Sequence, residues 1–395
     1  MRAPTDAAGP PFGGWRPLLA VYAPAALFST AQGAVLPVLP LTARDLGASV
    51  AVSAFVVALL GVGQVAGALP AGALVARVGE RGAMLVSAVV SAAALAGAAS
   101  APDETVLSLC VLALGLAAAA WSLARQSFLT AAAPPHLRAR ALSTLGGVGR
   151  LGAFAGPFLG AAGSAAWDVR GPYAVAVAAV ALAAVVVLTL PDPDVADQAH
   201  PGPAPTLRDV LRSHARVLAT LGVAALAVQA VRQSRQTVLP LWCDHVGLDA
   251  TTTSLVAGLS GAVDVLLFYP AGSVMDRLGR AAVGVPSMLV LAAGHLLLPL
   301  AHTAWTVALV GVVLGLGNSM GAGLVMTLGA DLAPPGGRAV FLGAWRLVTD
   351  AGAASGPLLV GALAGAAGLT AATGGVAVLA VLAAGGLFRF VPRRS

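Results

Sequence analysis

The sequence Pro270-Ala-Gly-Ser-Val-Met-Asp-Arg-Leu-Gly-Arg280 has a partner 200 residues earlier, the sequence Pro70-Ala-Gly-Ala-Leu-Val-Ala-Arg-Val-Gly-Glu-Arg81. Each segment starts at the Pro-Ala-Gly end of an apolar stretch and continues into a short turn that contains arginine and glycine. A biased composition can repeat alanine or leucine by chance, but it does not place Pro-Ala-Gly, arginine and glycine in one register. The chain therefore contains an internal repeat.

Apolar stretches occupy most of the sequence between such turns. Of the 395 residues, 58% are hydrophobic and only 10% are charged, whereas a soluble domain has roughly 25% charged residues. A membrane-spanning helix needs about 20 mostly apolar residues. Twelve stretches meet this requirement: 17–41, 51–75, 82–101, 105–132, 140–167, 171–190, 214–242, 251–274, 281–301, 304–331, 338–367 and 369–388. We predict an all-α membrane protein with twelve transmembrane helices.

The repeat extends over nearly the whole chain without a gap. At a shift of 200 residues the matches include Pro40 with Pro240, Gly47 with Gly247, Pro134 with Pro334, Arg138 with Arg338, and Gly152, Gly156 and Pro157 with Gly352, Gly356 and Pro357. Six helices in each copy place both copies in the membrane the same way round. Parallel repeats of this kind are related by an axis along the membrane normal, with a substrate site between them near the midplane.

These patterns divide the chain into four parts. We predict a cytoplasmic segment at 1–16, a six-helix bundle at 17–190, a cytoplasmic linker at 191–213 and a second bundle at 214–395 with a short basic tail. Arginines gather in alternate loops, with Arg77, Arg81, Arg138, Arg277 and Arg338 on one side. Because cytoplasmic loops carry an excess of basic residues, both termini are expected in the cytoplasm and the protein in the cell (cytoplasmic) membrane.

The turn after the eighth helix resembles a known signature. Gly272, Asp276, Arg277, Gly279 and Arg280 have the spacing G-x-x-x-D-R-x-G-R of the major facilitator superfamily. That resemblance implies two six-helix halves that work by alternating access. In that family the aspartate and arginine help lock the halves together on the cytoplasmic side.

The first copy of this signature is incomplete. It retains Gly72, Arg77 and Gly79, but Ala76 replaces the aspartate. The usual lock of the first half is therefore not expected in full.

The fifth helix carries a second motif, Gly152-x-x-x-Gly156-Pro157-x-x-Gly160. It resembles the antiporter signature of exporters in the same superfamily, and this favours export over import. The alternative is plain helix packing, since glycines one turn apart allow a neighbouring backbone to approach closely.

Several polar residues fall inside the apolar stretches, where a charge costs at least ~2.5 kcal/mol and should face a cavity or a partner. We propose Asp264 and Asp350 as candidates for proton coupling. The candidates for a substrate cavity are Gln32, Gln64, Arg150, Gln229, Arg232, Gln233, Arg235, Gln236, Asn318 and Arg346. Residues 229, 232, 233 and 236 share one helix face, and Gln32 and Gln64 are the counterparts of Arg232 and Asp264. The alternative is fixed ion pairing, either between Arg346 and Asp350 at i and i+4 or between Asp264 and an arginine of the seventh helix.

The sequence has no phosphate-binding loop, metal-ligand spacing or nucleophile motif, so we expect neither an enzyme nor a cofactor or metal. The expected function is proton-coupled export of a small amphipathic compound, a drug or a secondary metabolite. Uptake or facilitated diffusion of a metabolite and a non-transporting sensor or accessory protein are the alternatives. The expected partners are membrane lipid, a small-molecule substrate and protons, without nucleic acid, and the protein is expected to be a monomer.

Overall fold

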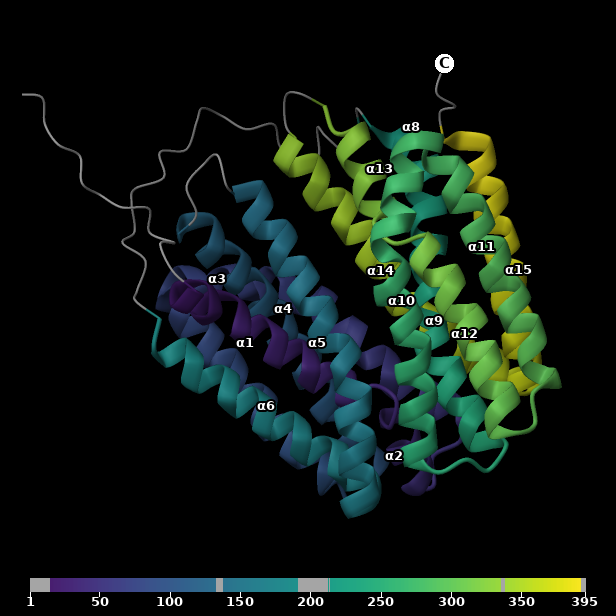
Figure 1. Cartoon of the computed structure of the whole chain (residues 1–395), viewed down its shortest axis with the longest axis horizontal. Helices are drawn as coiled ribbons and strands as arrows, with labels where there is room; N and C mark the ends of the chain where they lie inside the picture. Colours follow the sequence, from purple (N-terminus) through teal and green to yellow (C-terminus); the bar gives the residue numbers. More distant parts are fainter. Residues whose placement is uncertain (1–14, 133–137, 191–211, 213, 335–337, 392–395) are drawn as a thin grey trace, which may run out of the picture.

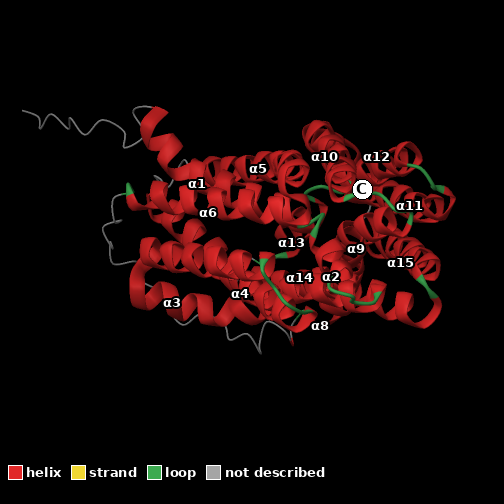
Figure 2. Ribbon diagram, turned by 90° about the horizontal axis from the view of Figure 1, so that it is seen from below, coloured by secondary structure: helices red, strands yellow, loops and turns green. Residues whose placement is uncertain are grey.

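The computed structural model describes residues 15–132, 138–190, 212, 214–334 and 338–391. Every regular element in these ranges is a helix (Figure 2). The first half contains α1 (Trp15–Val35), α2 (Leu39–Asp45), α3 (Val50–Ala99), α4 (Glu104–Ala132), α5 (Arg138–Trp167), the turn η1 (Asp168–Arg170) and α6 (Gly171–Leu188). The second half contains α8 (Ala215–Val217), η2 (Leu218–Gly222), α9 (Val223–His245), α10 (Ala250–Leu278), α11 (Arg280–Leu297), η3 (Leu298–Leu300), α12 (Ala304–Met320), α13 (Leu324–Leu332), α14 (Arg338–Ala367) and α15 (Leu369–Phe390). The predicted linker, 191–213, lies outside the described residues except for Arg212.

The prediction of twelve transmembrane helices agrees with these elements. Within the described residues, ten candidate spans are long and apolar enough to cross a membrane, and two of them are 50 and 48 residues long. The first of these is α3, whose backbone turns at Gly79 (φ 71°). The second contains the turn η1 between α5 and α6, where Asp168 has a φ of 52°. Each of these two therefore supplies two crossings, which accounts for twelve.

Glycines in left-handed conformations end helices at the same places in both halves. Gly79 and Gly279 have φ values of 71° and 95°, and Gly47 and Gly247 have values of 89° and 77°. Side chains rarely adopt such φ values, so glycine is the residue that turns the chain here. Because both pairs are 200 residues apart, the local geometry follows the repeat seen in the sequence.

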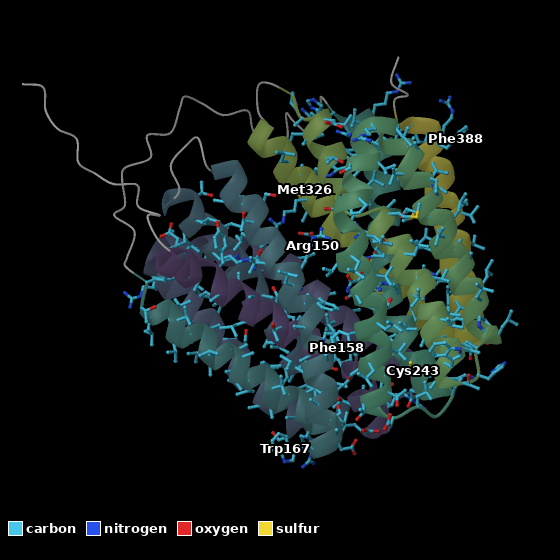
Figure 3. The ribbon with its side chains drawn as sticks, in the orientation of Figure 1. Arg150, Phe158, Trp167, Cys243, Met326 and Phe388 are labelled. Atoms are coloured by element: carbon cyan, nitrogen blue, oxygen red, sulfur yellow. The ribbon has the colours of Figure 1, made fainter. Side chains whose placement is uncertain are left out.

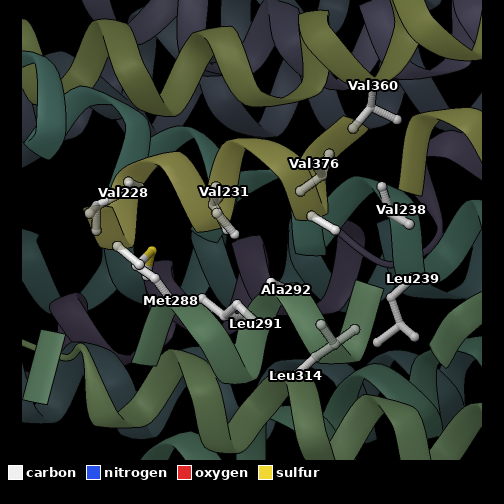
Figure 4. Packing of buried hydrophobic residues seen from close by; sticks show 14 of the residues in the cluster. Val228, Val231, Val238, Leu239, Met288, Leu291, Ala292, Leu314, Val360 and Val376 are labelled. Carbon is white, nitrogen blue, oxygen red and sulfur yellow. The ribbon is translucent and has the colours of Figure 1, made fainter. Parts of the chain in front are cut away.

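Each half has its own apolar core. Figure 4 shows part of the core of the second half, where Val231 of α9, Leu291 of α11 and Leu314 of α12 meet. Large apolar side chains are also exposed on the outside, for example Leu182 on α6 at 52% and Leu382 on α15 at 66%. An exposed apolar surface of this kind is suited to lipid rather than to water.

The halves meet mainly through two pairs of helices, α3 with α14 and α5 with α10, and α2 also contacts α9. On the first seam a Cβ added to Gly61 would lie 2.9 Å from the Cα of Ala354, and on the second the ring of Phe158 lies against Gly258. The ribbons converge toward the end that holds α2 and diverge toward the end that holds α13 (Figure 1). We refer to these as the α2 end and the α13 end.

An ion pair joins the halves at the α2 end. The Nε atom of Arg44 lies 3.1 Å from a carboxylate oxygen of Asp244. The two residues are 200 positions apart and therefore occupy equivalent places in the two repeats. The α2 end is thus closed by contacts from both halves around their approximate symmetry axis.

Candidate functional site

A cavity of about 350 Å³ lies between the halves. Such a volume lies within the usual range of small-molecule sites. Its lining combines polar residues with many apolar ones: Gln32, Gly33, Leu36, Pro37, Arg150, Ala153, Phe154, Pro157, Arg235, Gln236, Leu239, Pro240, Ala257, Ser260, Gly261, Asp264, Val265 and Asn318. These residues come from α1, α5, α9, α10 and α12 and the segment between α1 and α2, so both halves build the site.

Asp264 is the carboxylate of this cavity, and its partners come from two other helices. A guanidinium nitrogen of Arg235 on α9 lies 2.9 Å from one carboxylate oxygen. The side-chain amide of Asn318 on α12 donates to both carboxylate oxygens at 2.8 Å. Arg235 also donates to the Ser260 hydroxyl at 2.6 Å. The carboxylate is therefore held by one charged and one neutral donor, as a buried charge requires.

Two further arginines surround this group. Arg232 donates through Nε to the amide oxygen of Asn318 at 2.8 Å, so Asn318 bridges Arg232 and Asp264. Arg150 belongs to the other half, on α5, and lies at the boundary between the halves in Figure 3. Both arginines are within electrostatic reach of Asp264. Three arginines around one aspartate give this cluster a net positive charge.

Arg235 has one donor that the cluster does not use. Its Nε atom is buried, and it has no hydrogen-bond partner among the described residues. An unpaired buried donor costs free energy until a ligand or a water molecule accepts its hydrogen bond. The Arg235 Nε–H is therefore a donor of this cluster that is not satisfied by the described residues.

A second, smaller cavity of about 40 Å³ lies inside the first half. Its lining is almost wholly apolar: Phe28, Ala31, Gln32, Val35, Leu36, Leu39, Leu60, Ser91, Leu95, Leu114 and Val180. Gln32 and Leu36 line both cavities. The small cavity is therefore a neighbour of the large one, on its N-terminal side.

The structure brings together about half of the predicted polar candidates. Gln32, Arg150, Arg235, Gln236, Asp264 and Asn318 line the large cavity. Gln64, Gln229, Arg232, Gln233, Arg346 and Asp350 are not part of its lining. Of the polar stripe predicted on α9, only Gln236 lines the cavity. Gln233 instead donates to the Gln236 side chain at 2.8 Å. The residue of α9 that contacts Asp264 is Arg235, which lies outside that stripe.

Asp350, the second proton-coupling candidate, has a different environment. It pairs with Arg346 one turn earlier on α14 at 3.5 Å, and the side chains are 47% and 59% exposed. Arg346 also approaches the Gln126 side chain of α4 at 3.5 Å, across the boundary between the halves. The i, i+4 pairing considered as the alternative is thus present, and no described contact links Asp350 to the cavity.

The glycines of the motif on α5 lie against α1. A Cβ on Gly152 would collide with the carbonyl oxygen of Ala26, and those on Gly156 and Gly160 would lie 2.5 and 2.8 Å from the carbonyl oxygens of Thr30 and Ala34. The glycines therefore act in close helix packing, which was the alternative interpretation. Pro157 differs from them because it lines the cavity.

Two arginines of the turns that follow α10 and the first part of α3 contact their own halves. Arg280 pairs with Asp331 at the end of α13 at 3.0 Å, and Arg81 donates to the Leu188 carbonyl oxygen of α6 at 2.6 Å. Arg77 and Arg277 are exposed. The side chain of Asp276 lies outside what the structure describes.

Sequence reasoning missed Ser260 and Phe154. Ser260 has Leu60 as its counterpart in the first half, and Arg235 and Asn318 have Val35 and Ala118. A polar residue whose repeat partner is apolar is the signal that could have found Ser260. Phe154 has no such signal, because one aromatic residue in an apolar helix is ordinary.

The sequence profile described as the Major Facilitator Superfamily matches residues 21–263 and 221–395. No curated protein matches the sequence. Among solved structures, the xylose transporter XylE from E. coli is 15% identical with a TM-score of 0.73, covering 95% of this chain and 97% of that chain.

Two other solved transporters are similar over as much of the chain. The nucleoside transporter NupG is 16% identical with a TM-score of 0.76, covering 94% of this chain and 99% of that chain. A POT family transporter in complex with 5-aminolevulinic acid is 13% identical with a TM-score of 0.79, covering 96% of this chain and 97% of that chain. At these identities the likeness shows the fold alone.

Proposed function

The chain belongs to the Major Facilitator Superfamily and is a secondary transporter, not an enzyme; from this premise we propose that it exports a small amphipathic organic compound in exchange for protons. The observation that carries the proposal is Asp264. It is a carboxylate in the cavity between the halves, and its charge is balanced by a side chain that can also bind substrate. The same residue can therefore link proton binding to substrate binding.

The exchange follows from competition between the proton and the substrate for the Asp264 carboxylate. When Asp264 is ionised, the salt bridge at 2.9 Å occupies the Arg235 guanidinium. A proton on the carboxylate removes the negative charge and weakens that bridge, because a charge-assisted hydrogen bond is roughly twice as strong as a neutral one. A substrate group that donates to the ionised carboxylate is released at the same time, because the protonated carboxyl attracts it less. Proton binding and substrate binding at this cluster therefore oppose each other, as exchange requires.

Alternating access supplies the movement across the membrane. The contacts at the α2 end, including Arg44–Asp244, hold the halves together on one side of the cavity. The halves rock about this cavity, so that contacts at the α2 end break while new ones form at the α13 end. With both termini in the cytoplasm, as the arginine distribution predicts, the described conformation is closed to the outside.

The test is proton-driven flux in inside-out membrane vesicles. The unaltered protein and the variants Asp264→Asn and Asp350→Asn are supplied with a panel of radiolabelled amphipathic compounds, with and without an imposed pH gradient. We expect at least one compound to accumulate only with the gradient. Asp264→Asn should lower that accumulation by about tenfold or more, since it removes the titrating carboxylate, while Asp350→Asn should retain most of it.

Asp249→Asn is the matched control. Asp249 caps the start of α10, where its carboxylate accepts the backbone N–H of Thr252 at 2.8 Å, and asparagine caps a helix about as well as aspartate. This variant removes a carboxylate that does not line the cavity and should transport normally. If flux is equal without a gradient and Asp264→Asn matches the unaltered protein, proton exchange is wrong and facilitated diffusion takes its place.

A further inference from the structure

The Asp264 carboxylate has room for another hydrogen bond. An ionised carboxylate offers about four acceptor positions on its two oxygens. Its Oδ2 atom accepts from Arg235 and Asn318, whereas its Oδ1 atom accepts from Asn318 alone. The Asp264 side chain is 19% exposed and lines the large cavity. A hydrogen-bond donor on the substrate therefore has an acceptor in Asp264 Oδ1.

Two glutamines of the same cavity have hydrogen-bonding groups that the described residues leave unused. Gln32 of α1 and Gln236 of α9 line the cavity from opposite halves. The Gln32 carboxamide makes no hydrogen bond to a described residue. Gln236 accepts from Gln233 through its side-chain oxygen at 2.8 Å, which leaves its amide nitrogen to donate elsewhere. Both glutamines can therefore donate an N–H to an acceptor in the cavity.

The charges around Asp264 decide which kind of donor fits. Arg150, Arg232 and Arg235 interact electrostatically with this one carboxylate. Because the cluster keeps an excess of positive charge even with Asp264 ionised, an ammonium group would be repelled from it. A neutral N–H or O–H bonds to the carboxylate without that repulsion. The donor that suits Asp264 is therefore uncharged.

The contacts and the direction of coupling exclude an anion as well. Arg235 is already bonded to Asp264 and Ser260, and Arg150 has an interaction of its own, so an anion would lie beside the Asp264 charge. A proton on Asp264 would remove that repulsion and tighten the binding of the anion. An anion would therefore travel with the proton, whereas an uncharged donor to the ionised carboxylate is displaced by it.

The rest of the large cavity suits an apolar group. Phe154, Pro157 and Leu239 belong to its lining and come from both halves. The Phe154 ring packs edge-to-face against Phe158, with the ring centroids 5.2 Å apart. A ring held in this way gives an aliphatic or aromatic group a fixed surface to pack against. Polar and apolar parts of one ligand are therefore both accommodated in this single cavity.

We infer that the exported substrate is an uncharged amphipathic compound whose polar group combines a donor for Asp264 with an acceptor for the N–H groups of Gln32 and Gln236. A primary or secondary amide is such a group. The inference rests on the proposed proton exchange and adds the chemical class of the substrate. The polar group and the proton compete for Asp264, while the glutamines orient the polar group and the arginines reject its cationic analogues.

Four probes with one apolar body test the polar group. 4-Phenylbutanamide is uncharged and has a donor and an acceptor, N,N-dimethyl-4-phenylbutanamide lacks the donor, 4-phenylbutylamine is a cation, and 4-phenylbutanoate is an anion. Binding to the purified full chain in nanodiscs is measured near neutral pH by saturation-transfer NMR, which detects weak ligands, with empty nanodiscs as the blank. We expect 4-phenylbutanamide to bind about tenfold more tightly than each of the others, because they lack the donor or carry a repelled charge.

The pH dependence of binding tests the competition with protons. 4-Phenylbutanamide does not titrate between pH 8 and pH 4, and Arg150, Arg232 and Arg235, which surround Asp264, stay charged throughout. Its affinity should fall about fivefold or more as Asp264 is protonated, since a charge-assisted hydrogen bond is lost. Asp264→Asn should bind it more weakly and without this fall. His295 on α11, which interacts with Arg235, is retained in that variant and would show any contribution of its own there.

A matched pair of variants tests the glutamines. Gln32→Leu removes the hydrogen-bonding groups without breaking a bond to any described residue, and it should weaken 4-phenylbutanamide about fivefold. Gln229→Leu is the control, because Gln229 also makes no described side-chain hydrogen bond but does not line the cavity. It should bind the amide like the unaltered protein. Equal affinities of the two variants would overturn the assignment of Gln32, and if Gln32→Leu does not fold, Gln236→Leu replaces it.

The outcomes separate this inference from the transport proposal. Tighter binding of the amine or of 4-phenylbutanoate, or no binding of 4-phenylbutanamide above the blank, overturns the uncharged class, and proton exchange is then decided by the vesicle flux alone. Tightest binding of 4-phenylbutanamide with one affinity at every pH supports the uncharged class and overturns the competition with protons. Tightest binding of this amide, weakened at low pH only when Asp264 is present, supports both.

Discussion

The two halves share their turns and their packing but differ in the residues that face the axis between them. The second half places Arg232, Arg235 and Asp264 near the centre of the molecule, and the positions equivalent to the last two hold Val35 and Gln64 in the first half. In both halves a glycine of the fifth or eleventh helix lies against the first or seventh helix, as Gly156 does against Thr30. The two halves therefore share their helix packing but differ in the charged residues at the centre of the molecule.

This division has a physical reason. Two ionic clusters facing each other in a low-dielectric site would require many partners, because each buried charge needs compensation. A single ionic cluster, built mainly by the second half, requires fewer such partners. Three predictions test how far the halves are interchangeable, and they run from the largest expected effect to the smallest.

The first prediction converts the ionic cluster into its counterpart. Arg235→Val leaves Asp264 without its charged partner and should lower the free energy of unfolding by about 3–5 kcal/mol. The double variant Arg235→Val/Asp264→Gln introduces the residues found at Val35 and Gln64 and should recover most of that loss. Unfolding is followed by thermal denaturation of the purified protein, and the unaltered protein, the two single variants and the double variant form a double-mutant cycle.

A double variant as unstable as Arg235→Val alone would contradict this account. The lost stability would then come from the packing of Arg235 itself and not from an unpaired carboxylate. Transport should be absent in the double variant in either case, since no titrating group remains at this position.

The second prediction concerns pH and the helix starts at the α2 end. Asp249 caps α10 through the Thr252 N–H, and hydrogen bonds from the Thr252 side chain and the Thr252 backbone lower the pKa of the Asp249 carboxyl below its ordinary value. Because that pKa is lowered in the folded protein, the stabilisation is present above the ordinary pKa of about 4 and is lost as the pH falls through the folded value. The equivalent cap of α3 is Ser49, which accepts the Val52 N–H and does not titrate in this range.

The measurement is amide hydrogen exchange between pH 5 and pH 2, corrected for the intrinsic rate. Protection of the Thr252 amide should fall by about two- to fivefold, because protonation removes the charge of the cap, which contributes roughly 0.3–1 kcal/mol at a helix N-terminus, while protection of Val52 stays constant. Equal loss at both amides would show that the α2 end opens as a whole at low pH. Asp249→Ser should make the two helix starts alike.

The third prediction uses the symmetry of the ion pair at the α2 end. Asp244→Arg places two positive charges together and should shift the protein toward the conformation that is open at this end. The exchange Arg44→Asp/Asp244→Arg should restore closure, because the two positions are equivalent. The shift should be about fivefold or less in population, since partly exposed pairs contribute roughly 0–1 kcal/mol.

Spin-label distances across the α2 end report this population. Recovery in the double variant should be incomplete, because Arg44 also donates to the Ala48 carbonyl oxygen at 2.7 Å and aspartate cannot. If the single and double variants have the same distance distribution, the pair does not contribute to closure.

Local patterns in the chain were sufficient for the fold. The number of crossings follows from the length of each apolar stretch, and the turn at Gly79 follows from a residue that tolerates a positive φ. Both are properties of short segments, so they can be read without knowing what lies nearby. The family resemblance at Gly272–Arg280 is likewise local and is confirmed by the profile match.

The site could be predicted only in part. The cost of a charge in lipid identified Arg150, Asp264 and Asp350 as residues in need of a partner. It did not distinguish the carboxylate in the cavity from the one that pairs along α14, because both have an arginine within reach. Helix periodicity also selected a polar face on α9 that excludes Arg235, although that residue contacts Asp264.

The sequence by itself determined that the protein lies in a membrane, that it crosses it twelve times and that its two halves are repeats. The crossings follow from the length of each apolar stretch and from the turn glycines, which are local properties of the chain. The repeat follows from direct comparison of the sequence with itself. Only the tertiary structure decided that Arg235 rather than Arg232 pairs with Asp264, that Asp350 lies apart, and that Gly156 packs against α1. These contacts depend on how each helix is rotated and tilted against its neighbours. That rotation is set by many side chains from distant parts of the chain acting together.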